Sequence, residues 1–319
     1  SFDVSITLPS NYVVGATGLL QDNPYEEAWM DSLAQLPAPS SRSNAFPPSA
    51  STTKTLRFKQ DNVHDFAWFA DKRFLVRNGE VTLARSGRKV QTQVLFTPAN
   101  ARLWKDAVTY VNESVRLYSQ WVGDYRYARC TAIDGTIAAG GGMEYPMITI
   151  IGNMGATYEL DQVIAHEVGH NWFYGMLASN ERDHPWMDEG MNSFFEQRYM
   201  ETRYPNQLST NVAGLPMYLI DKHFDITFRR QNELMYRYNA RRNWDSPTSS
   251  TSTAFSEVDY GTTVYAKTAL IFDQLRGSLG DALFDSCTQA YFTAWAGKHP
   301  QPADVRASHE RTSGRDLGW

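Results

Sequence analysis

The segment HEVGH at 166–170 constrains this chain more than any other part of it. It places His166 and His170 four residues apart, and on a helix positions i and i+4 lie on one face. Two ring nitrogens on one face can bind a single ion at about 2.0–2.1 Å from each. The spacing therefore predicts a helix folded around a metal ion, against the alternative of a buried helix whose two imidazoles are merely hydrogen-bonded.

A third ligand is predicted beyond His170, where eighteen residues lead to Glu189 in the stretch WMDEGMNSFFE. A second helix over this stretch could return the carboxylate to the same ion. Two His and one Glu leave the fourth tetrahedral position for water, which is the pattern of catalytic zinc sites and not of closed structural ones. Glu167 is next to the first ligand and close enough to act as general base on that water. These residues indicate a hydrolytic site with one Zn²⁺ ion.

Hydrophobic periodicity predicts an α+β organisation. The stretch FDVSITL at 2–8 alternates apolar and polar side chains, as a half-buried strand does. Asn78-Gly79 is a strong hairpin-turn signal. Further strands are predicted at 53–60, 74–78, 80–85, 89–97 and around 127–133, and helices at 98–123, 158–176, 185–204 and 262–280.

Composition narrows the classes of function. The net charge is −5 and no block of like charges occurs, so neither nucleic acid nor an anionic membrane is expected as a partner. No apolar stretch approaches the length of about eighteen residues that a membrane span requires. Cys130 and Cys287 form no CxxC pair and are expected to be buried thiols.

The motifs together resemble those of the M1 or gluzincin zinc aminopeptidases. HEVGHNWFYG and WMDEGMNSFFE look like the family's signature of HExxH, eighteen residues and Glu. GGGMEYP at 140–146 is similar to its GxMEN exopeptidase motif. TVYAKTAL at 263–270 is similar to VYEKGA, the segment that bears the family's catalytic tyrosine. Tyr145 replaces the Asn of the exopeptidase motif, so the preference for a particular N-terminal residue is not implied.

The resemblance implies a role for each residue of these motifs. Zinc would be held by His166, His170 and Glu189, with Glu167 as the base and Tyr265 as a hydrogen-bond donor to the oxyanion. The substrate would meet Gly142, Met143 and Glu144, whose carboxylate grips the free α-ammonium, and Tyr260, a tyrosine that often lines the family's site. Glu196, two helical turns beyond Glu189, is the best candidate to hydrogen-bond a metal-ligating side chain.

The expected fold is a thermolysin-like catalytic domain over 89–319, preceded by a partial N-terminal β domain over 1–88. Its mixed sheet would carry GGMEYP on an edge strand, where substrate backbone can add as a further strand. Members of the family have further domains, so the remainder of a longer chain is an expected partner.

Three functions stay open. The first is an aminopeptidase that removes N-terminal residues from peptides by attack of a zinc-activated water. The second is an endopeptidase or another hydrolase with the same zinc site, against which Glu144 argues because it would find no ammonium there. The third is a weakly active or inactive fragment that binds peptides or scaffolds partners, although the positions that carry the chemistry are all filled.

Overall fold

The computed structural model describes residues 1–37, 45–137, 141–205 and 227–318. The chain forms two compact units, Ser1–Met176 and Leu177–Trp319. The first combines strands with helices, and the described residues of the second are helical or irregular, so the fold class is α+β as predicted. The domain boundary predicted between residues 88 and 89 stays a prediction, and it falls directly before the strand Lys89–Phe96 of the first unit.

The first unit is built on a five-stranded mixed sheet with the order β6-β7-β8-β10-β9. Strands β7, β8 and β10 run parallel, and β6 and β9 are antiparallel at the two edges. A three-stranded sheet, β1-β4-β3, and a two-stranded one, β2-β5, come from the first part of the chain. The strands are β1 (Phe2–Pro9), β2 (Val13–Ala16), β3 (Leu19–Leu20), β4 (Thr53–Gln60), β5 (Trp68–Asp71), β6 (Leu75–Thr82), β7 (Lys89–Phe96), β8 (Arg129–Asp134), β9 (Gly142–Tyr145) and β10 (Ile148–Ile151).

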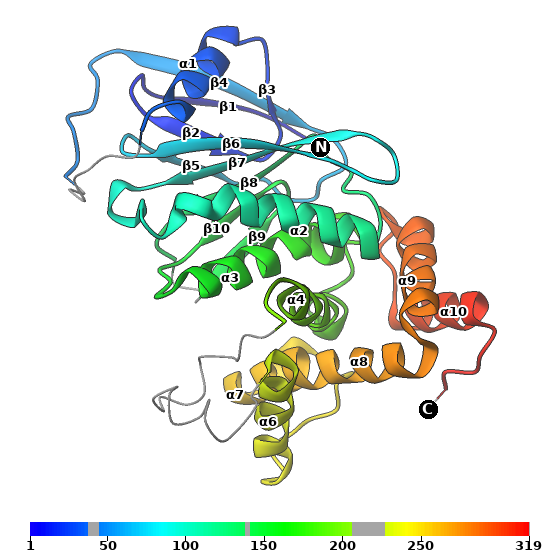
Figure 1. Ribbon diagram of the computed structural model, residues 1–319. Helices are drawn as coiled ribbons and strands as arrows, with labels where there is room; N and C mark the ends of the chain where they lie inside the picture. The colour runs from blue at the N-terminus through cyan, green and yellow to red at the C-terminus, as the bar shows by residue number, and fades with distance from the viewer. Residues whose placement is uncertain (38–44, 138–140, 206–226, 319) are drawn as a thin grey trace. The chain divides into compact units, whose positions relative to one another are not determined.

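Helices cover both faces of the five-stranded sheet. Helices α2 (Ala107–Trp121) and α3 (Thr157–His170) lie side by side on one face (Figure 1). Helix α1 (Pro24–Ala34) packs on the other face with Trp29 and Met30. Because α3 contacts β9 and β10, the helix that carries both histidines lies against the edge strand that carries Glu144.

A row of branched side chains forms the core under α1. Val76, Leu95, Ile133 and Ile150 are register partners across four adjacent strands, and all are at most 7% exposed. Each such side chain contributes about 1.5–3 kcal/mol when it is fully buried. This row fixes the register of the sheet, because a slip by one residue would turn every apolar side chain to the opposite face.

The hairpin turn predicted at Asn78-Gly79 is wrong. Strand β6 runs straight through both residues, and Gly79 is the partner of Thr92 on β7. A Cβ at Gly79 would lie 2.7 Å from Oγ1 of Thr92 and 2.8 Å from Cγ2 of Val108 on α2. The glycine is therefore needed for close packing of α2, and the chain turns later, at 83–88, where Gly87 has φ +70°.

The other local predictions differ from the structure mainly at element ends. Residues 98–106, predicted as the start of a helix, instead form the 3₁₀ turns Pro98–Asn100 and Trp104–Asp106. The helix predicted at 158–176 is α3 followed by a π-helical segment, Asn171–Met176. Cys130 and Cys287 are buried free thiols, which confirms the prediction.

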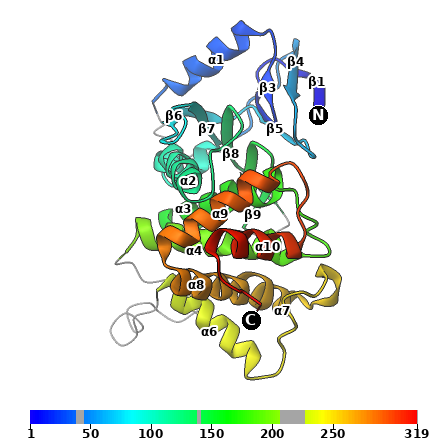
Figure 2. The ribbon, with the colours of Figure 1, turned by 90° about the vertical axis from the view of Figure 1, so that its right-hand side faces the viewer.

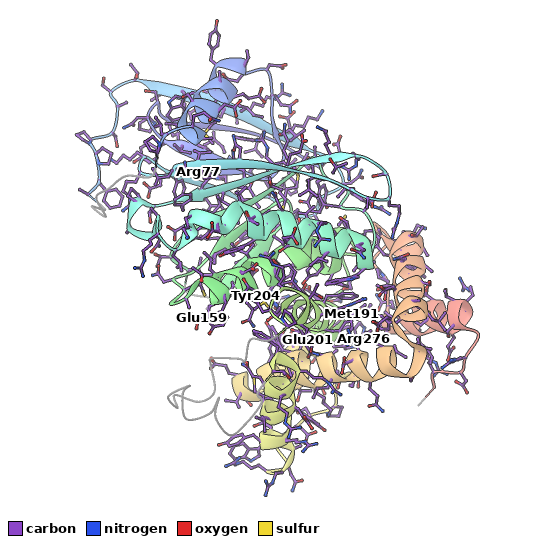
Figure 3. The ribbon with its side chains drawn as sticks, in the orientation of Figure 1. Arg77, Glu159, Met191, Glu201, Tyr204 and Arg276 are labelled. Carbon is purple, nitrogen blue, oxygen red and sulfur yellow. The ribbon has the colours of Figure 1, made fainter. Side chains whose placement is uncertain are left out.

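Helices make up the second unit. Helix α9 packs on α10 (Figure 2), and Arg276 of α8 reaches Glu201 of α4 at 4.0 Å (Figure 3). Within the described parts of the chain, no helix combines the length and apolar character needed to cross a membrane. The elements are a 3₁₀ turn (Pro185–Met187), α4 (Glu189–Arg203), α6 (Phe228–Ala240), a 3₁₀ turn (Ser252–Ala254), α7 (Glu257–Asp259), a π-helical segment (Tyr260–Lys267), α8 (Thr268–Leu279), α9 (Asp281–Trp295) and α10 (Pro302–Ser313).

Candidate active site

Helix α3 brings the two imidazoles of HEVGH together. Nε2 of His166 lies 3.1 Å from Nε2 of His170, and the ring centroids are 4.8 Å apart. Two nitrogens that share a tetrahedral ion at zinc–nitrogen bond lengths would be about 3.3 Å apart. The pair is therefore spaced to bind one metal ion. His170 is buried and His166 is half-buried, so the ion would lie at the edge of the protein interior.

Glu167 occupies a space that Gly142 leaves open. Its side chain is 5% exposed, and a Cβ built on Gly142 would overlap the Glu167 carboxylate. A larger residue at position 142 would have to displace the predicted base. The neighbouring Gly141 is different, because a Cβ there would make only ordinary contacts at 3.8 Å with Val163.

Strand β9 holds Glu144 beside the imidazoles. Glu144 pairs with Thr149 of β10, and one of its carboxylate oxygens lies within 4.8 Å of a ring nitrogen of His170. The two strands are joined by Pro146 and Met147, and Met147 has φ +69°. A proline followed by a residue with positive φ is typical of a type II turn. The tight turn fixes the register that carries Gly142 and Glu144 to the end of α3. Met143 is on the same strand, opposite Ile150, with its side chain against the core row.

Asn171 ties the end of α3 to this hairpin. Its Oδ1 accepts hydrogen bonds from the backbone N–H of Met147, at 2.9 Å, and from the Tyr125 hydroxyl, at 3.3 Å, while its Nδ2 donates to the Val168 carbonyl at 3.0 Å. Burial raises the pKa of Tyr125 well above its ordinary value, so the hydroxyl stays a donor. Sequence reasoning missed Asn171, although an amide directly after the second histidine was a signal for a polar cap at the end of the helix.

The remaining predicted residues belong to the second unit. Glu189 is the first residue of α4 and is half-buried. A Cβ on the next residue, Gly190, would lie 2.7 Å from the Val264 carbonyl oxygen and 2.6 Å from Cβ of Thr268. Only glycine lets the first turn of α4 approach the π-helical segment this closely. The glycine therefore brings the element of Glu189 against the segment that bears Tyr265.

Tyr265 and Tyr260 lie together on the π-helical segment, with ring centroids 5.8 Å apart. The segment is anchored by Asp259, which is 5% exposed and accepts hydrogen bonds from Oγ1 of Thr263, at 2.7 Å, and from Ser246. Sequence reasoning missed Asp259. The π-helical geometry around a predicted catalytic residue is itself a common mark of functional sites.

Glu196 and His184 also belong to the second unit but are not among the proposed ligands or catalytic groups. Glu196 is half-buried on α4, two turns after Glu189, and its role beside a ligand stays a prediction. His184 lines an apolar pocket with Trp186 and Phe272.

His166, His170 and Glu189 are a candidate set of ligands for one metal ion. Nitrogen and oxygen donors in this number suit zinc with one coordination position left open. The donor chemistry thus fits the ion that the sequence predicts.

Comparison with known proteins assigns the chain to a family. Residues 140–319 match the peptidase family M1 domain, and the chain belongs to this family. Leucine aminopeptidase 2 of Emericella nidulans is 23% identical over 172 residues, which are 53% of this chain and 26% of that protein. The resemblance to the M1 zinc metallopeptidases drawn from the sequence motifs is thus confirmed.

Solved structures have the same fold. One is an M1 zinc metallopeptidase mutant from Deinococcus radiodurans bound to a Tyr-Ser-Ala substrate, 16% identical, with a TM-score of 0.67 over 98% of this chain and 61% of that one. Another is Legionella pneumophila aminopeptidase A in complex with aspartic acid, 15% identical, with a TM-score of 0.67 over 99% of this chain and 33% of that one. The chain therefore spans less than two thirds of the length of these proteins.

Proposed function

We propose that the chain is the catalytic part of a zinc aminopeptidase that removes N-terminal residues from peptides. The observation that carries the proposal is the 3.1 Å spacing of the His166 and His170 nitrogens with the Glu144 carboxylate beside them. Zinc, held by these histidines and Glu189, would polarise the scissile carbonyl and lower the pKa of the attacking water.

Glu144 supplies the selectivity for a chain end. In a peptide the α-ammonium of the first residue is only two bonds away from the carbon of the first peptide carbonyl. A carboxylate within 4.8 Å of a metal-ligating nitrogen can therefore pair with that ammonium while the carbonyl is at the metal. An internal peptide bond offers no cation at this distance. Strand β9 is at the edge of its sheet, so its backbone can also hold the substrate in an extended conformation.

Glu167 and Tyr265 would move and stabilise charge. The Glu167 carboxylate takes a proton from the attacking water and passes it to the leaving amine. The Tyr265 hydroxyl donates a hydrogen bond to the oxygen that becomes negative in the transition state. Tyr260 and Gly142 would line the space for the first side chain, and Met143, whose side chain packs on the core, would contribute only its backbone.

The test compares zinc content and peptide cleavage in the parent chain and in Glu167→Gln. The variant should keep its zinc and lose about 10²–10⁴-fold in kcat, the range expected for a general base. Glu113→Gln, the same change at a surface ion pair on α2, is the matched control and should cleave normally. Removal of zinc with a chelator should abolish cleavage, and added zinc should restore it.

The choice of substrate separates the alternatives. Leucine anilide or a peptide with a free amine should be cleaved, and the N-acetylated form should not. Equal cleavage of both forms would favour the endopeptidase, and equal rates in the parent and Glu167→Gln would refute the catalytic assignment. Zinc binding with peptide affinity but no turnover would favour the fragment that only binds.

A further inference from the structure

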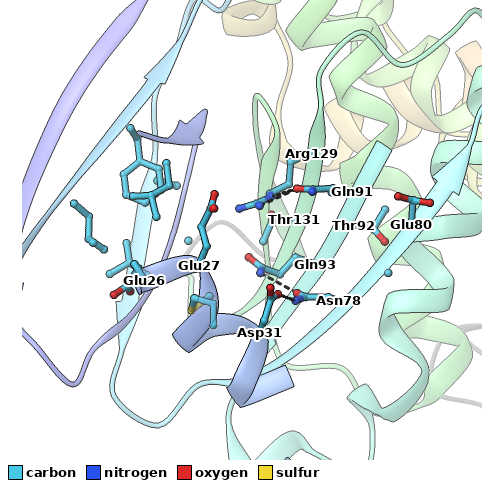
Figure 4. Close-up of a pocket in the computed structure, with 18 residues that line it drawn as sticks. Glu26, Glu27, Asp31, Asn78, Glu80, Gln91, Thr92, Gln93, Arg129 and Thr131 are labelled. Atoms are coloured by element: carbon cyan, nitrogen blue, oxygen red, sulfur yellow. Dashed lines mark hydrogen bonds between the residues drawn. The ribbon is translucent and has the colours of Figure 1, made fainter. Parts of the chain in front are cut away.

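A polar cavity lies in the first unit, between α1 and the five-stranded sheet, and we call it the α1 pocket (Figure 4). Its volume is about 280 Å³. Pockets for drug-sized ligands hold about 300–1,000 Å³, so a ligand here would be smaller. None of the residues proposed for peptide cleavage lines it.

The floor of the α1 pocket continues the sheet face that forms the apolar core. Two residues along each strand from Val76, Leu95 and Ile133, the same face carries Asn78, Gln93 and Thr131. Two residues further it carries Glu80, Gln91 and Arg129. The face thus changes from apolar to polar within four residues on three strands, and Asn78, Glu80 and Gln91 at its polar end are exposed. Gln93 and Thr131 on the same face are nevertheless buried, and buried polar side chains need hydrogen-bonding partners.

Arg129 is the cation of the floor. Its guanidinium donates to Oε1 of Gln91 through Nη2 at 2.9 Å and through Nε at 3.3 Å (Figure 4). It makes no ion pair with any residue that the structure describes, and its Nη1 donates to none of them. Burial lowers the pKa of Arg129, and the negative charges of Glu27 and Asp31 oppose that shift. The guanidinium stays charged and offers donors in a fork that matches a carboxylate.

The opposite wall is acidic. Glu27 and Asp31 are one turn apart on α1, and Figure 4 shows both on the wall that faces the strands. Asp31 accepts a hydrogen bond from Asn78 at 2.9 Å, and the Glu27 carboxylate makes no hydrogen bond or ion pair within the described part of the chain. The other two acids are neutralised, since Glu26 pairs with Lys54 and Glu80 with Lys89.

A third wall is apolar and completes the site. It includes Leu56 and Phe58 of β4, which are 1% and 5% exposed, and Met30 of α1. A simple anion would meet Glu27, and a simple cation would meet Arg129. No three side chains of the pocket, among those described, are close enough to share a metal ion. A ligand that matches this lining carries both charges and an apolar group.

We propose that the α1 pocket binds a free α-amino acid with an apolar side chain. The α-carboxylate pairs with Arg129, the α-ammonium with Glu27 and Asp31, and the side chain lies against Leu56 and Phe58. This site is separate from the zinc residues, and its occupancy does not depend on the proposed peptidase activity. If that activity holds, the ligand class is also the class of product that the enzyme releases.

Calorimetric titration of the full chain with L-leucine tests the proposal. Binding should be saturable, and it should weaken by about tenfold or more in Glu27→Gln and in Arg129→Gln, the loss of one hydrogen bond to a charged group. Arg102→Gln, at an exposed arginine outside the pocket, should bind as the parent does. Glu27 is exposed, so its variant carries the test even if Arg129→Gln fails to fold.

Two analogues assign each charge to its partner. N-acetyl-leucine lacks the ammonium and leucinamide lacks the carboxylate, so both should bind the parent weakly. Leucine and leucinamide should bind Arg129→Gln equally. The preference for leucine over N-acetyl-leucine should be smaller in Glu27→Gln than in the parent, because only Asp31 then remains to pair with the ammonium.

A third variant, Glu144→Gln, shows whether leucine binds at the peptidase site instead. Glu144→Gln in metal-free protein should leave leucine binding unchanged. Loss of binding in Glu144→Gln with normal binding in Glu27→Gln would overturn the proposal, and so would the absence of saturable binding at millimolar leucine. Neither result would bear on the peptidase activity, which the zinc and Glu167→Gln experiments measure separately.

Discussion

Gly142 and Gly190 each lie beside a residue of the candidate site, but a side chain would meet different neighbours at the two positions. In the first unit, a Cβ at Gly142 would overlap the end of a flexible side chain, Glu167. In the second, a Cβ at Gly190 would meet a backbone carbonyl, at 2.7 Å, and a buried threonine. A side chain at position 142 would therefore displace the proposed base, and a side chain at position 190 would disturb the packing of α4.

Of the substitutions that test this comparison, Gly142→Ala should have the largest effect, and the effect should be on kcat. The carboxylate of Glu167 can move aside, so the melting temperature should hold while kcat falls by about 10²-fold, as for a catalytic group misplaced by 1 Å. Gly141→Ala is the matched control, because a Cβ at this position would lie 3.8 Å from the Val163 side chain, which is an ordinary van der Waals contact. A fall in kcat of the same size in both variants would break the comparison.

Gly190→Ala should act on stability. The overlap with the Val264 carbonyl forces α4 away from the π-helical segment, and such overpacking costs about 1–3 kcal/mol of unfolding free energy. Gly277→Ala, at a position on α8 with open space, should instead raise stability by about 0.4–1 kcal/mol. Denaturant unfolding of both variants measures this, and an unchanged free energy in Gly190→Ala would contradict the assignment.

Acid should destabilise the second unit slightly through His309. Burial lowers the pKa of this imidazole, whose ring lies 6.1 Å from that of Tyr291 and whose Nδ1 is 2.8 Å from the Val305 carbonyl oxygen. As the pH falls below about 6.5, the His309 imidazole becomes protonated in the unfolded chain but stays neutral in the folded chain. Stability should then fall by about 1.4 kcal/mol for each unit of difference between the two pKa values.

The measurement for His309 is the melting temperature between pH 7 and pH 5. His309→Gln should remove the extra loss of stability at the lower pH. His299→Gln changes an exposed imidazole of the same unit and should behave as the parent does. The same pH dependence in all three proteins would exclude His309 as its source.

Much of the candidate site was predictable because its signals are local. The two histidines four apart predicted one helix and one face, and α3 brings their nitrogens to 3.1 Å. The strands at 2–8, 53–60 and 89–97 followed from alternation and are confirmed to within a residue or two. The Asn78-Gly79 signal failed because the demand for space came from Val108, a residue of a helix that forms later in the chain.

Sequence alone determined which residues can bind a metal and act as a base, because ligand type and helical spacing do not depend on distant segments. Tertiary structure decided that Gly142 must be small for Glu167 and that Asn171 holds the hairpin to α3. It also decided that Arg129 faces Glu27 across a cavity, because α1, which carries Glu27, packs on a sheet whose strand β8 carries Arg129 about a hundred positions later. Such contacts have no period along the chain, and only the packed sheet creates them.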